Sequence, residues 1–405
     1  MQTFNYTARD TNTGSKVKNQ VQAVSERAAA QLLIEKGLSP IEIKPERESG
    51  LFGLGSKKIK TKDRIIFARQ LSTLINAGLP LVQSLRSTLD QTTNAPMRVL
   101  ISEIIADIES GIPFSDALAK HPKVFSTIFV SLVAAGEASG TLDTSLERLA
   151  LQQEKDAEIL SKVRGAMVYP MIVVLVMFGV VSFMIVAVLP QVAQLYEGQD
   201  GVNLPFITQA LLNLSNFARG PGGIVLVAGF IAAVVFLRQY IRTTRGKTQF
   251  DKAKMRVPPF GQLFMKLYMA RFARTASTLV ASGVPLLQVL EIVSESIGNT
   301  IVGGSIKQAI AKVKGGKSLA DAIEGDPSFL SLVPNMLRVG EQSGSIEQML
   351  GRTADYYEKE VDNQIKTVST IIEPVLMVIL GIVSITIVGA ILLPIYSLVG
   401  QNVLR

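Results

Sequence analysis

Residues 171–189 read MIVVLVMFGVVSFMIVAVL, nineteen consecutive positions without an ionisable side chain. A helix needs about 20 apolar residues to cross the hydrocarbon core of a bilayer. Residues 375–393, VLMVILGIVSITIVGAILL, form a second uncharged stretch of the same length. Each stretch is followed by a proline, Pro190 or Pro394, which is expected to end the helix. The sequence therefore predicts two membrane-spanning helices.

A third and shorter apolar stretch, GGIVLVAGFIAAVVFL, covers residues 222–237. It can reach spanning length upstream through Pro221, or downstream past Arg238, whose long side chain can extend to the interface. The composition agrees with a membrane protein, because 48% of the residues are hydrophobic and 18% are charged. We therefore expect three spans.

Basic residues are distributed unevenly around these spans. The segment 190–221 carries a single base, Arg219, whereas the segment 238–260 carries seven. Cytoplasmic loops are enriched in Lys and Arg, so we expect a cytoplasmic N-terminus and an extracytoplasmic C-terminus. This topology accounts for the excess of 41 basic over 33 acidic residues, and we expect no nucleic-acid binding.

The chain contains an internal duplication. The segment FARQLSTLINAGLPLVQSL at 67–85 aligns with FARTASTLVASGVPLLQVL at 272–290, with eleven of nineteen positions identical. Further along, GEASGTLDTSLER at 136–148 aligns with GEQSGSIEQMLGR at 340–352, with six of thirteen positions identical. The alignment continues to the prolines after the first and last spans. Each copy is thus predicted to be a cytoplasmic domain followed by its own span, and the unpaired middle span returns the chain across the membrane.

Each cytoplasmic copy is predicted to be a compact bundle of short helices joined by tight turns. In the first copy, Thr61 is expected to cap a helix, Gly78 to end it and Pro80 to open the next. Gly283 and Pro285 repeat this turn in the second copy. The helix after each GE-x-S-G segment is expected to be long and to run into the membrane.

The repeated GE-x-S-G segment has two interpretations. Structurally, the glycines Gly136, Gly140, Gly340 and Gly344 end one helix, a hydroxyl residue begins the next, and the glutamate supports the turn. Functionally, an exposed acidic turn in each copy contacts a basic partner surface or places a cation at a subunit contact. Both interpretations stay open, and the candidates for partner contact are Glu137, Asp143, Glu341 and Glu347.

The first residues differ from the repeats. Phe4, Tyr6 and Ala8 alternate as in a strand, and further strands with one helix are expected after them. The fold class is therefore mainly α: a polytopic membrane protein with three transmembrane helices, two duplicated cytoplasmic helical bundles and a small N-terminal α/β module. The expected segments are the N-terminal module at 1–45, a linker at 46–60, the first bundle at 61–166, the first span at 167–190, an extracytoplasmic loop at 191–220, the middle span at 221–240, a linker with the second bundle at 241–369, the last span at 370–394 and an extracytoplasmic tail at 395–405.

The sequence offers little for catalysis. It has no cysteine and one histidine, His121, with no second ligand candidate nearby in the sequence. The segment AKVKGGKS at 311–318 approaches a phosphate-binding loop, but Ala311 replaces its first glycine and the preceding residues favour helix where that motif requires a strand. The three apolar stretches contain no Asp, Glu, Lys or Arg, which argues against a transporter or channel. We expect no catalytic residue, no cofactor and no metal.

Taken together, the motifs resemble those of a known family. They are F-x-Y-x-A-x-D at 4–10, the two FAR segments, the two GE-x-S-G segments, the Glu373-Pro374 pair before the last span and LLP at 392–394. In this order the chain resembles the inner-membrane platform proteins of type IV pilus and type II secretion machines, the PilC and GspF family. The first copy has Tyr169 where the second has Glu373.

The resemblance implies a non-enzymatic role. Platform proteins of this kind are thought to engage a cytoplasmic hexameric assembly ATPase through their bundles and to lie near pilin subunits and other inner-membrane assembly proteins in the lipid bilayer. Self-association into a homo-oligomer is also implied. We expect a role in pilus assembly, with the equivalent role in type II secretion as the alternative. A signalling protein is disfavoured, because the outer loop of about thirty residues is small for a sensor domain.

Overall fold

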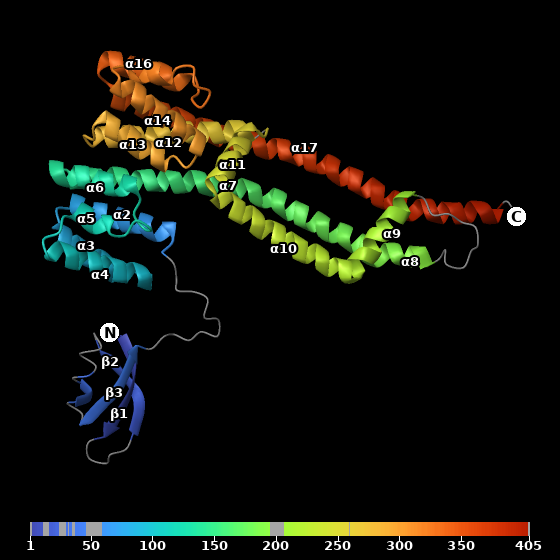
Figure 1. The fold of residues 1–405 in the computed structure, drawn as a ribbon, viewed down its shortest axis with the longest axis horizontal. Helices are drawn as coiled ribbons and strands as arrows, with labels where there is room; N and C mark the ends of the chain where they lie inside the picture. The colour runs from blue at the N-terminus through green and yellow to red at the C-terminus, as the bar shows by residue number, and fades with distance from the viewer. Residues whose placement is uncertain are drawn as a thin grey trace. The chain divides into compact units, whose positions relative to one another are not determined.

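The computed structural model describes residues 2–10, 16–23, 30, 32–34, 37–45, 59–194, 206–258 and 260–403. The chain divides into two units, Met1–Lys58 and Ile59–Arg405, and each is described by itself (Figure 1). Most of the expected linker at 46–60, and residues 195–205 of the expected outer loop, lie outside the described residues.

The N-terminal unit contains an antiparallel sheet in the order β2-β1-β3. Alternation along the central strand puts Tyr6 and Ala8 on the same face, where both are buried with Leu33 from a helical segment at 32–34. The strands are β1 (Gln2–Asp10), β2 (Lys16–Ala23) and β3 (Leu38–Pro45).

The first helical bundle forms around a cluster of aromatic side chains. Phe125 lies between Phe67 and Phe129, with ring centroids 5.8 and 4.8 Å away. The first helix begins at Thr61, preceded by Lys60, whose backbone N–H donates to the Asp63 carboxylate at 2.8 Å, so Thr61 is not the cap. The helices are α2 (Thr61–Asn76), α3 (Leu81–Gln91), α4 (Ala95–Glu109), α5 (Phe114–Ala119) and α6 (Thr127–Ser139).

The second bundle repeats this arrangement, with Phe272 buried at the position equivalent to Phe67. The cores of the two bundles join into one contiguous cluster of buried residues. The segment before Gly315 is helical, as expected, so the strand that a phosphate-binding loop requires is absent there. The helices are α11 (Thr244–Arg256), α12 (Phe260–Ala281), α13 (Leu286–Ser296), α14 (Thr300–Lys314), α15 (Leu319–Ile323) and α16 (Leu332–Ser343).

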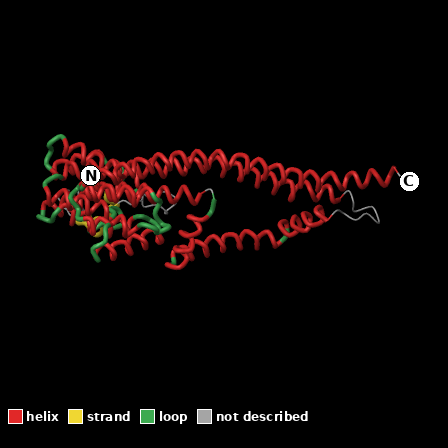
Figure 2. The backbone as a smooth tube through the Cα atoms, turned by 90° about the horizontal axis from the view of Figure 1, so that it is seen from above, coloured by secondary structure: helices red, strands yellow, loops and turns green. Residues whose placement is uncertain are grey.

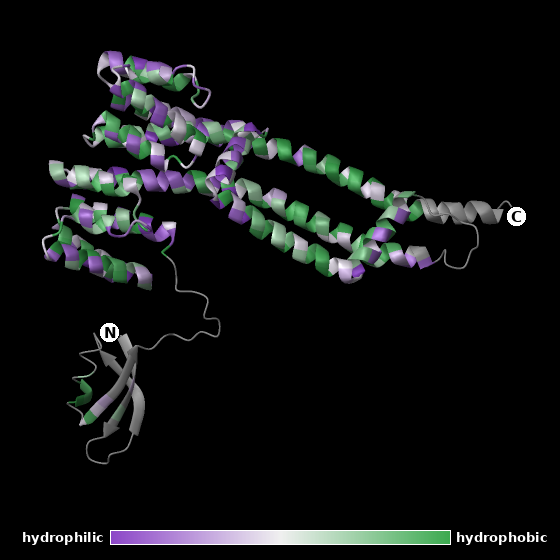
Figure 3. Ribbon diagram, viewed as in Figure 1, coloured by the Kyte–Doolittle hydropathy of each residue, from purple (hydrophilic) through white to green (hydrophobic). Residues whose placement is uncertain are grey.

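Each bundle continues into a long helix. In the part of the chain that the structure describes, three helical segments are long and apolar enough to span a membrane: Leu142–Gln191, Pro221–Arg242 and Ile346–Leu392. Their apolar stretches stand out in Figure 3, and Figure 2 shows the last helix running unbroken toward the C-terminus. The expectation of three spans is confirmed. The elements are α7 (Leu142–Phe183), the π-helix η1 (Met184–Val188), α8 (Leu189–Gln194), α9 (Phe206–Arg219), α10 (Pro221–Arg242) and α17 (Ile346–Val403).

The prolines after the first and last spans do not end their helices, so that expectation is wrong. Pro190 lies within α8 and Pro394 within α17. A proline in a helix lacks the N–H that would bond to the carbonyl four residues earlier, and this carbonyl then needs another donor. The π-helix η1 lies between α7 and α8, so the helix of the first span changes to wider i to i+5 hydrogen bonding just before its proline.

The short helix α9 supplies the missing donors in both copies. The carbonyl four residues before the first proline belongs to Val186, and the Arg219 guanidinium donates to it. The equivalent carbonyl before the second proline belongs to Ala390, and the Thr208 hydroxyl donates to it at 3.0 Å. Thr208 and Ala390 are both buried. The far ends of the first and last spans are therefore held by opposite ends of the same helix.

Candidate functional site

The GE-x-S-G segments form the turn between each bundle and its long helix. Gly140 after α6 has φ 71°, and Gly344 after α16 has φ 68°. Glycine adopts this left-handed conformation without the steric cost that a Cβ brings. The Ser139 hydroxyl lies 2.7 Å from the Thr141 hydroxyl, and the equivalent pair in the second copy is 2.6 Å apart. The turn is thus built in the same way in both copies.

The other two glycines of the segments lie inside α6 and α16 rather than at helix ends. A Cβ at Gly136 would stand 2.5 Å from the Ser145 hydroxyl oxygen, and one at Gly340 would stand 2.9 Å from the Ile346 Cα. Neither distance leaves room for a side chain. These glycines allow the last bundle helix to pack closely against the start of the long helix.

Glu137 is held inside the first bundle. Its carboxylate accepts hydrogen bonds from the Phe114 and Ser115 backbone N–H groups at 2.8 and 3.0 Å, and from the Ser115 hydroxyl at 2.7 Å. Burial opposes ionisation, but the bonds from Ser115 and Phe114 outweigh it and hold the pKa of Glu137 below its usual range. The carboxylate therefore ties the start of α5 to α6.

Glu341 occupies the equivalent place in the second bundle. Its carboxylate accepts hydrogen bonds from the Leu319 and Ala320 backbone N–H groups at 2.6 and 3.2 Å, at the start of α15. Both carboxylate oxygens are engaged within the bundle, as in Glu137. The contacts therefore favour the structural interpretation of these two glutamates.

Asp143 and Glu347 are placed differently. They lie in the first turns of α7 and α17, and their side chains are exposed. Within the described ranges, neither carboxylate has a hydrogen-bond or ion-pair partner. No group of three or more His, Cys, Asp or Glu that could hold a metal ion occurs in that same part of the chain. Among the four candidates, these two leave a carboxylate available to a partner.

His121 makes contacts within the first bundle. Its Nε2 lies 3.7 Å from the Glu103 carboxylate, and its backbone carbonyl accepts bonds from Val124 and Phe125 in the turn before α6. It is only partly exposed.

A repeated ion pair that the sequence patterns did not predict joins each bundle to its long helix. Arg69 donates to the Glu154 carboxylate, with Nε 2.7 Å from Oε1, and Arg274 donates to Glu358 at 2.8 Å. The Arg69 guanidinium holds the pKa of Glu154 below its usual range. Both arginines close a FAR triplet, and both glutamates precede a lysine at the repeat spacing. That shared dipeptide is the signal that could have identified the pair.

The two copies are fastened to each other along α7, α12 and α17. Gln152 donates to the Thr275 hydroxyl at 2.9 Å in a buried position, and Lys162 donates to Asp362 at 2.7 Å. Between these polar contacts lies an apolar cluster formed by Ile159, Leu263, Leu267, Val361 and Ile365. The long helices of the two copies are therefore in contact before they reach the apolar stretches.

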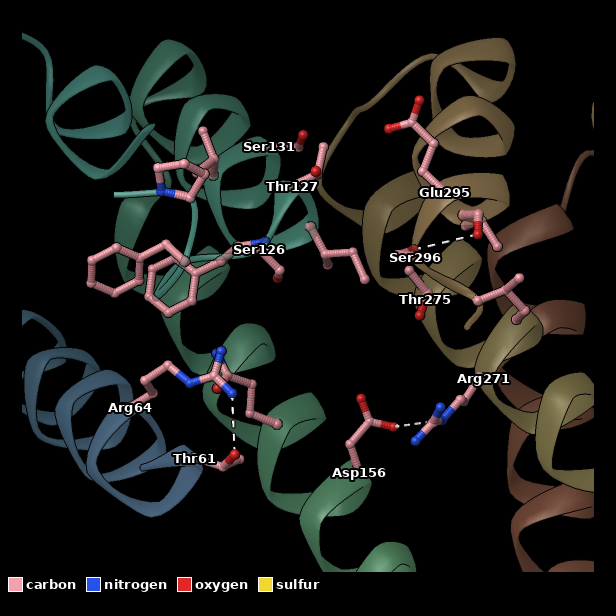
Figure 4. A pocket seen from close by; sticks show the side chains of 18 of the residues that line it. Thr61, Arg64, Ser126, Thr127, Ser131, Asp156, Arg271, Thr275, Glu295 and Ser296 are labelled. Carbon is pink, nitrogen blue, oxygen red and sulfur yellow. Dashed lines mark hydrogen bonds and ion pairs between the residues drawn. The ribbon is translucent and has the colours of Figure 1, made fainter. Parts of the chain in front are cut away.

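A cleft of about 680 Å³ opens between the bundles, lined by α2, α6 and α7 on one side and α12 and α13 on the other (Figure 4). Asp156 and Arg271 face each other across it at 3.8 Å. Burial raises the pKa of Asp156, although Arg271 opposes the shift. Arg64, on the same wall as Asp156, donates to the Val124 carbonyl at 2.8 Å. The cleft separates the two copies where they diverge from their common helical seam.

Comparison with known proteins agrees with this architecture. The family described as Type II secretion system (T2SS), protein F matches residues 67–190 and again 272–394, which confirms the duplication. The family described as Type II secretion system protein F, N-terminal domain matches residues 1–44.

Named relatives cover nearly the whole chain. The type IV pilus assembly protein PilC of Thermus thermophilus is 36% identical over 99% of this chain and 99% of its own. PilC of Myxococcus xanthus is 38% identical over 96% of this chain and 94% of its own. The type II secretion system protein F of Pseudomonas aeruginosa is 33% identical over 98% and 99%. With its three spans and its two copies of the repeated domain, the chain is a membrane protein that belongs to the type II secretion system protein F family, which includes the PilC proteins of type IV pilus assembly.

Proposed function

We propose that this protein is the non-enzymatic inner-membrane platform of a type IV pilus assembly machine, and that it couples a cytoplasmic hexameric assembly ATPase to the insertion of pilin subunits. The supporting observation is the continuity of the helices α7 and α17. Each begins at a turn pinned to the bundle and reaches the apolar stretch of its span without a break. A scaffold that transmits displacement needs such a connection.

The contacts around these helices favour the transmission of force. At 1.5 Å per residue, the 58 residues of α17 extend about 90 Å. The repeated ion pairs of Arg69 and Arg274 link each bundle to its helix, and the Lys162 to Asp362 pair links the two helices to each other, beside the apolar packing of the same elements. A displacement of either bundle would therefore pass along α7 and α17 into the membrane.

The proposed orientation places both bundles in the cytoplasm, the N-terminus inside and the C-terminus outside. The seven bases at 238–256, next to the middle span, support it, because cytoplasmic flanks are enriched in Lys and Arg. The equivalent platform role in type II secretion is the alternative, supported by the relatives that carry that name.

Partner contact is proposed for the acidic turns, mainly through Asp143 and Glu347, with Glu137 and Glu341 shaping the turns. Gln342 is exposed beside the second turn and suits a photo-crosslinking residue. A matched control is Gln308, an exposed glutamine on α14. We expect adducts with a pilus ATPase from Gln342 and none from Gln308. Only self-adducts would make the turn an oligomer contact, and a secretion ATPase would support the alternative.

Coupling itself is tested by breaking the helix. Seven residues of Gly and Ser inserted between Lys366 and Thr367, both exposed, would introduce a flexible joint between bundle and membrane. Seven residues of Ala, Glu and Lys at the same place make about two helical turns. They keep α17 stiff and leave the following residues on the same sides of the helix as before. We expect the flexible insert to abolish surface filaments at normal protein level and with the ATPase crosslink intact, and the helical insert to retain some. Equal filament assembly with both inserts would refute coupling through α17.

A further inference from the structure

The helix α11 is attached to the middle span by a fixed corner. Thr243 separates it from α10, and the Thr243 hydroxyl accepts a bond from the Gly246 N–H at 3.1 Å. A Cβ at Gly246 would stand 2.0 Å from the Tyr240 carbonyl oxygen, so only glycine permits this close fold of α11 against the end of α10. Figure 1 shows α11 running across the direction of α10 where α10 meets the bundles.

The inner face of α11 is fastened to the second bundle. Asp251 is buried, and its carboxylate accepts bonds from the Thr300 N–H at 2.9 Å and the Thr300 hydroxyl at 3.0 Å, at the start of α14. With α11 held at its first turn and at its middle, its opposite face has a fixed direction.

The opposite face carries basic and apolar residues in adjacent strips. Exposed polar side chains follow the helical spacing i, i+4, i+7 and i+11, and they are Arg245, Gln249, Lys252 and Arg256. Two exposed apolar side chains, Phe250 and Ala253, follow at i and i+3 beside them, and the exposed Val257 comes directly after the helix as its C-cap. Phe250 is 40% exposed and Val257 is 50% exposed. This is the pattern of a helix that lies in a membrane interface.

The positive charge of this region is not neutralised by the protein. Seven bases lie between 238 and 256. The acidic residue among them is Asp251, and its carboxylate is occupied by hydrogen bonds from Thr300 on α14. Across the ranges that the structure describes, none of the seven forms an ion pair, while Lys254 lies 4.4 Å from the Phe250 ring. Each Lys or Arg near an anionic bilayer surface strengthens binding to that surface about fivefold.

We propose that the outer face of α11 binds the phosphate headgroups of anionic phospholipids. Arg245, Lys252 and Arg256 contact the phosphates, since guanidinium and ammonium groups form charge-assisted hydrogen bonds with them. Phe250 and Val257 enter the boundary between headgroups and acyl chains. A lipid surface fits better than an acidic protein, because the basic strip adjoins an apolar strip and the helix continues directly from a membrane span.

This role does not depend on the proposed coupling function, and it gives the second bundle a defined height above the membrane. Because α11 is joined to α14 through Asp251, lipid contact with α11 also fixes the orientation of the second bundle.

The test uses full-length protein in nanodiscs of phosphatidylcholine alone, or with about one third phosphatidylglycerol to supply the negative surface charge. The chain has no cysteine, so Ala253→Cys gives a single site for an environment-sensitive fluorophore. We expect a blue-shifted emission and quenching by spin-labelled lipid in the anionic discs, both reduced by high salt.

Two sets of variants separate specific binding from bulk charge. Changing Arg245, Lys252 and Arg256 together to Gln is expected to weaken retention of phosphatidylglycerol on the order of 100-fold. Changing the exposed bases Lys307, Lys317 and Lys359 together to Gln removes the same charge elsewhere and is expected to change retention less than threefold. Arg245→Lys with Arg256→Lys should retain most of the binding, because the two ammonium groups keep the positive charge of the face.

The proposal is overturned if both triple variants behave alike, or if the label at position 253 reports the same water exposure in neutral and anionic discs. Protection of that label only after an acidic partner protein is added would make this face a protein contact, and would equally overturn the lipid assignment.

Discussion

Removal of the Glu137 carboxylate is predicted to loosen the start of α5. The carboxylate accepts three hydrogen bonds from Phe114 and Ser115, all between 2.7 and 3.0 Å. A bond to a charged group contributes about 1.5–3 kcal/mol, and the three are not additive at a partly exposed position, so we assign about 2–3 kcal/mol to Glu137→Ala. That free energy corresponds to a rise of about 30- to 150-fold in the local opening equilibrium. Glu137→Gln keeps one acceptor oxygen and should produce about a tenfold rise.

Hydrogen exchange measured by mass spectrometry on the full-length protein suits this test, because the chain contains no tryptophan to report unfolding by fluorescence. The amides of α5 should exchange faster in Glu137→Ala, while those in the middle of α4 change little. Asp143→Ala is the matched control, since that exposed carboxylate has no partner in the described part of the chain. Unchanged protection of α5 in Glu137→Ala would refute the anchoring role, and loss of the ATPase crosslink at the same time would make Glu137 a partner contact.

The same bonds predict a pH dependence. The pKa of Glu137 is lowered in the folded bundle, so its contribution to stability is present above the unfolded pKa of about 4.3 and is lost as the pH falls through the folded value. Exchange in α5, corrected for its intrinsic pH dependence, should therefore increase below about pH 4.3 in the wild type. It should be flat over that range in Glu137→Gln.

Other substitutions test the remaining contacts. Gly340→Ala should destabilise the second bundle by about 2–3 kcal/mol, because the new Cβ meets backbone atoms. Gly344→Ala should cost about 1–2 kcal/mol, because its positive φ disfavours a residue with a Cβ. Thermal melts followed by circular dichroism would rank the two variants, and the reverse order would contradict the packing assignment. Thr208→Val should lower the melting temperature, because it leaves a buried carbonyl without a donor at a cost of about 1–3 kcal/mol. Adding Pro394→Ala should reverse much of this loss by restoring an amide N–H to that carbonyl. If the second substitution rescues nothing, the Thr208 hydroxyl does not compensate for the proline. Glu154→Gln should cost only about 0.5–1 kcal/mol, because its ion pair with an arginine is half exposed, and the loss should shrink in high salt; a salt-independent loss would indicate a packing role instead.

The spans and the bundle turns could be predicted from the sequence because their causes are local. Nineteen uncharged residues in a row identify a spanning helix without reference to the rest of the fold. Gly78 was expected to end a helix, and its φ of 86° is one that favours glycine. Comparison of the two copies then transferred each local feature from one bundle to the other.

The contacts that fix the elements relative to one another could not be predicted, because their partners are distant in the sequence. Pro394 continues its helix since the carbonyl it leaves free is served by Thr208, 182 residues before that carbonyl. Glu137 looked like an exposed turn residue because the amides that engage it are 22 and 23 residues away. In both cases a local rule gave the chemical need, and tertiary structure supplied the group that met it.

The helix α9 changes how the two long helices can move. Near the bundles, α7 and α17 are joined by Lys162 and Asp362, and at their far ends α9 holds both through Arg219 and Thr208. Two rods joined at both ends form a closed linkage, which opposes the sliding of one rod past the other. Tilting, bowing or twisting of the pair together remains available. If the proposed coupling holds, a push delivered to one bundle would reach the far ends of the spans as a shared rotation of both rather than as a piston stroke of one.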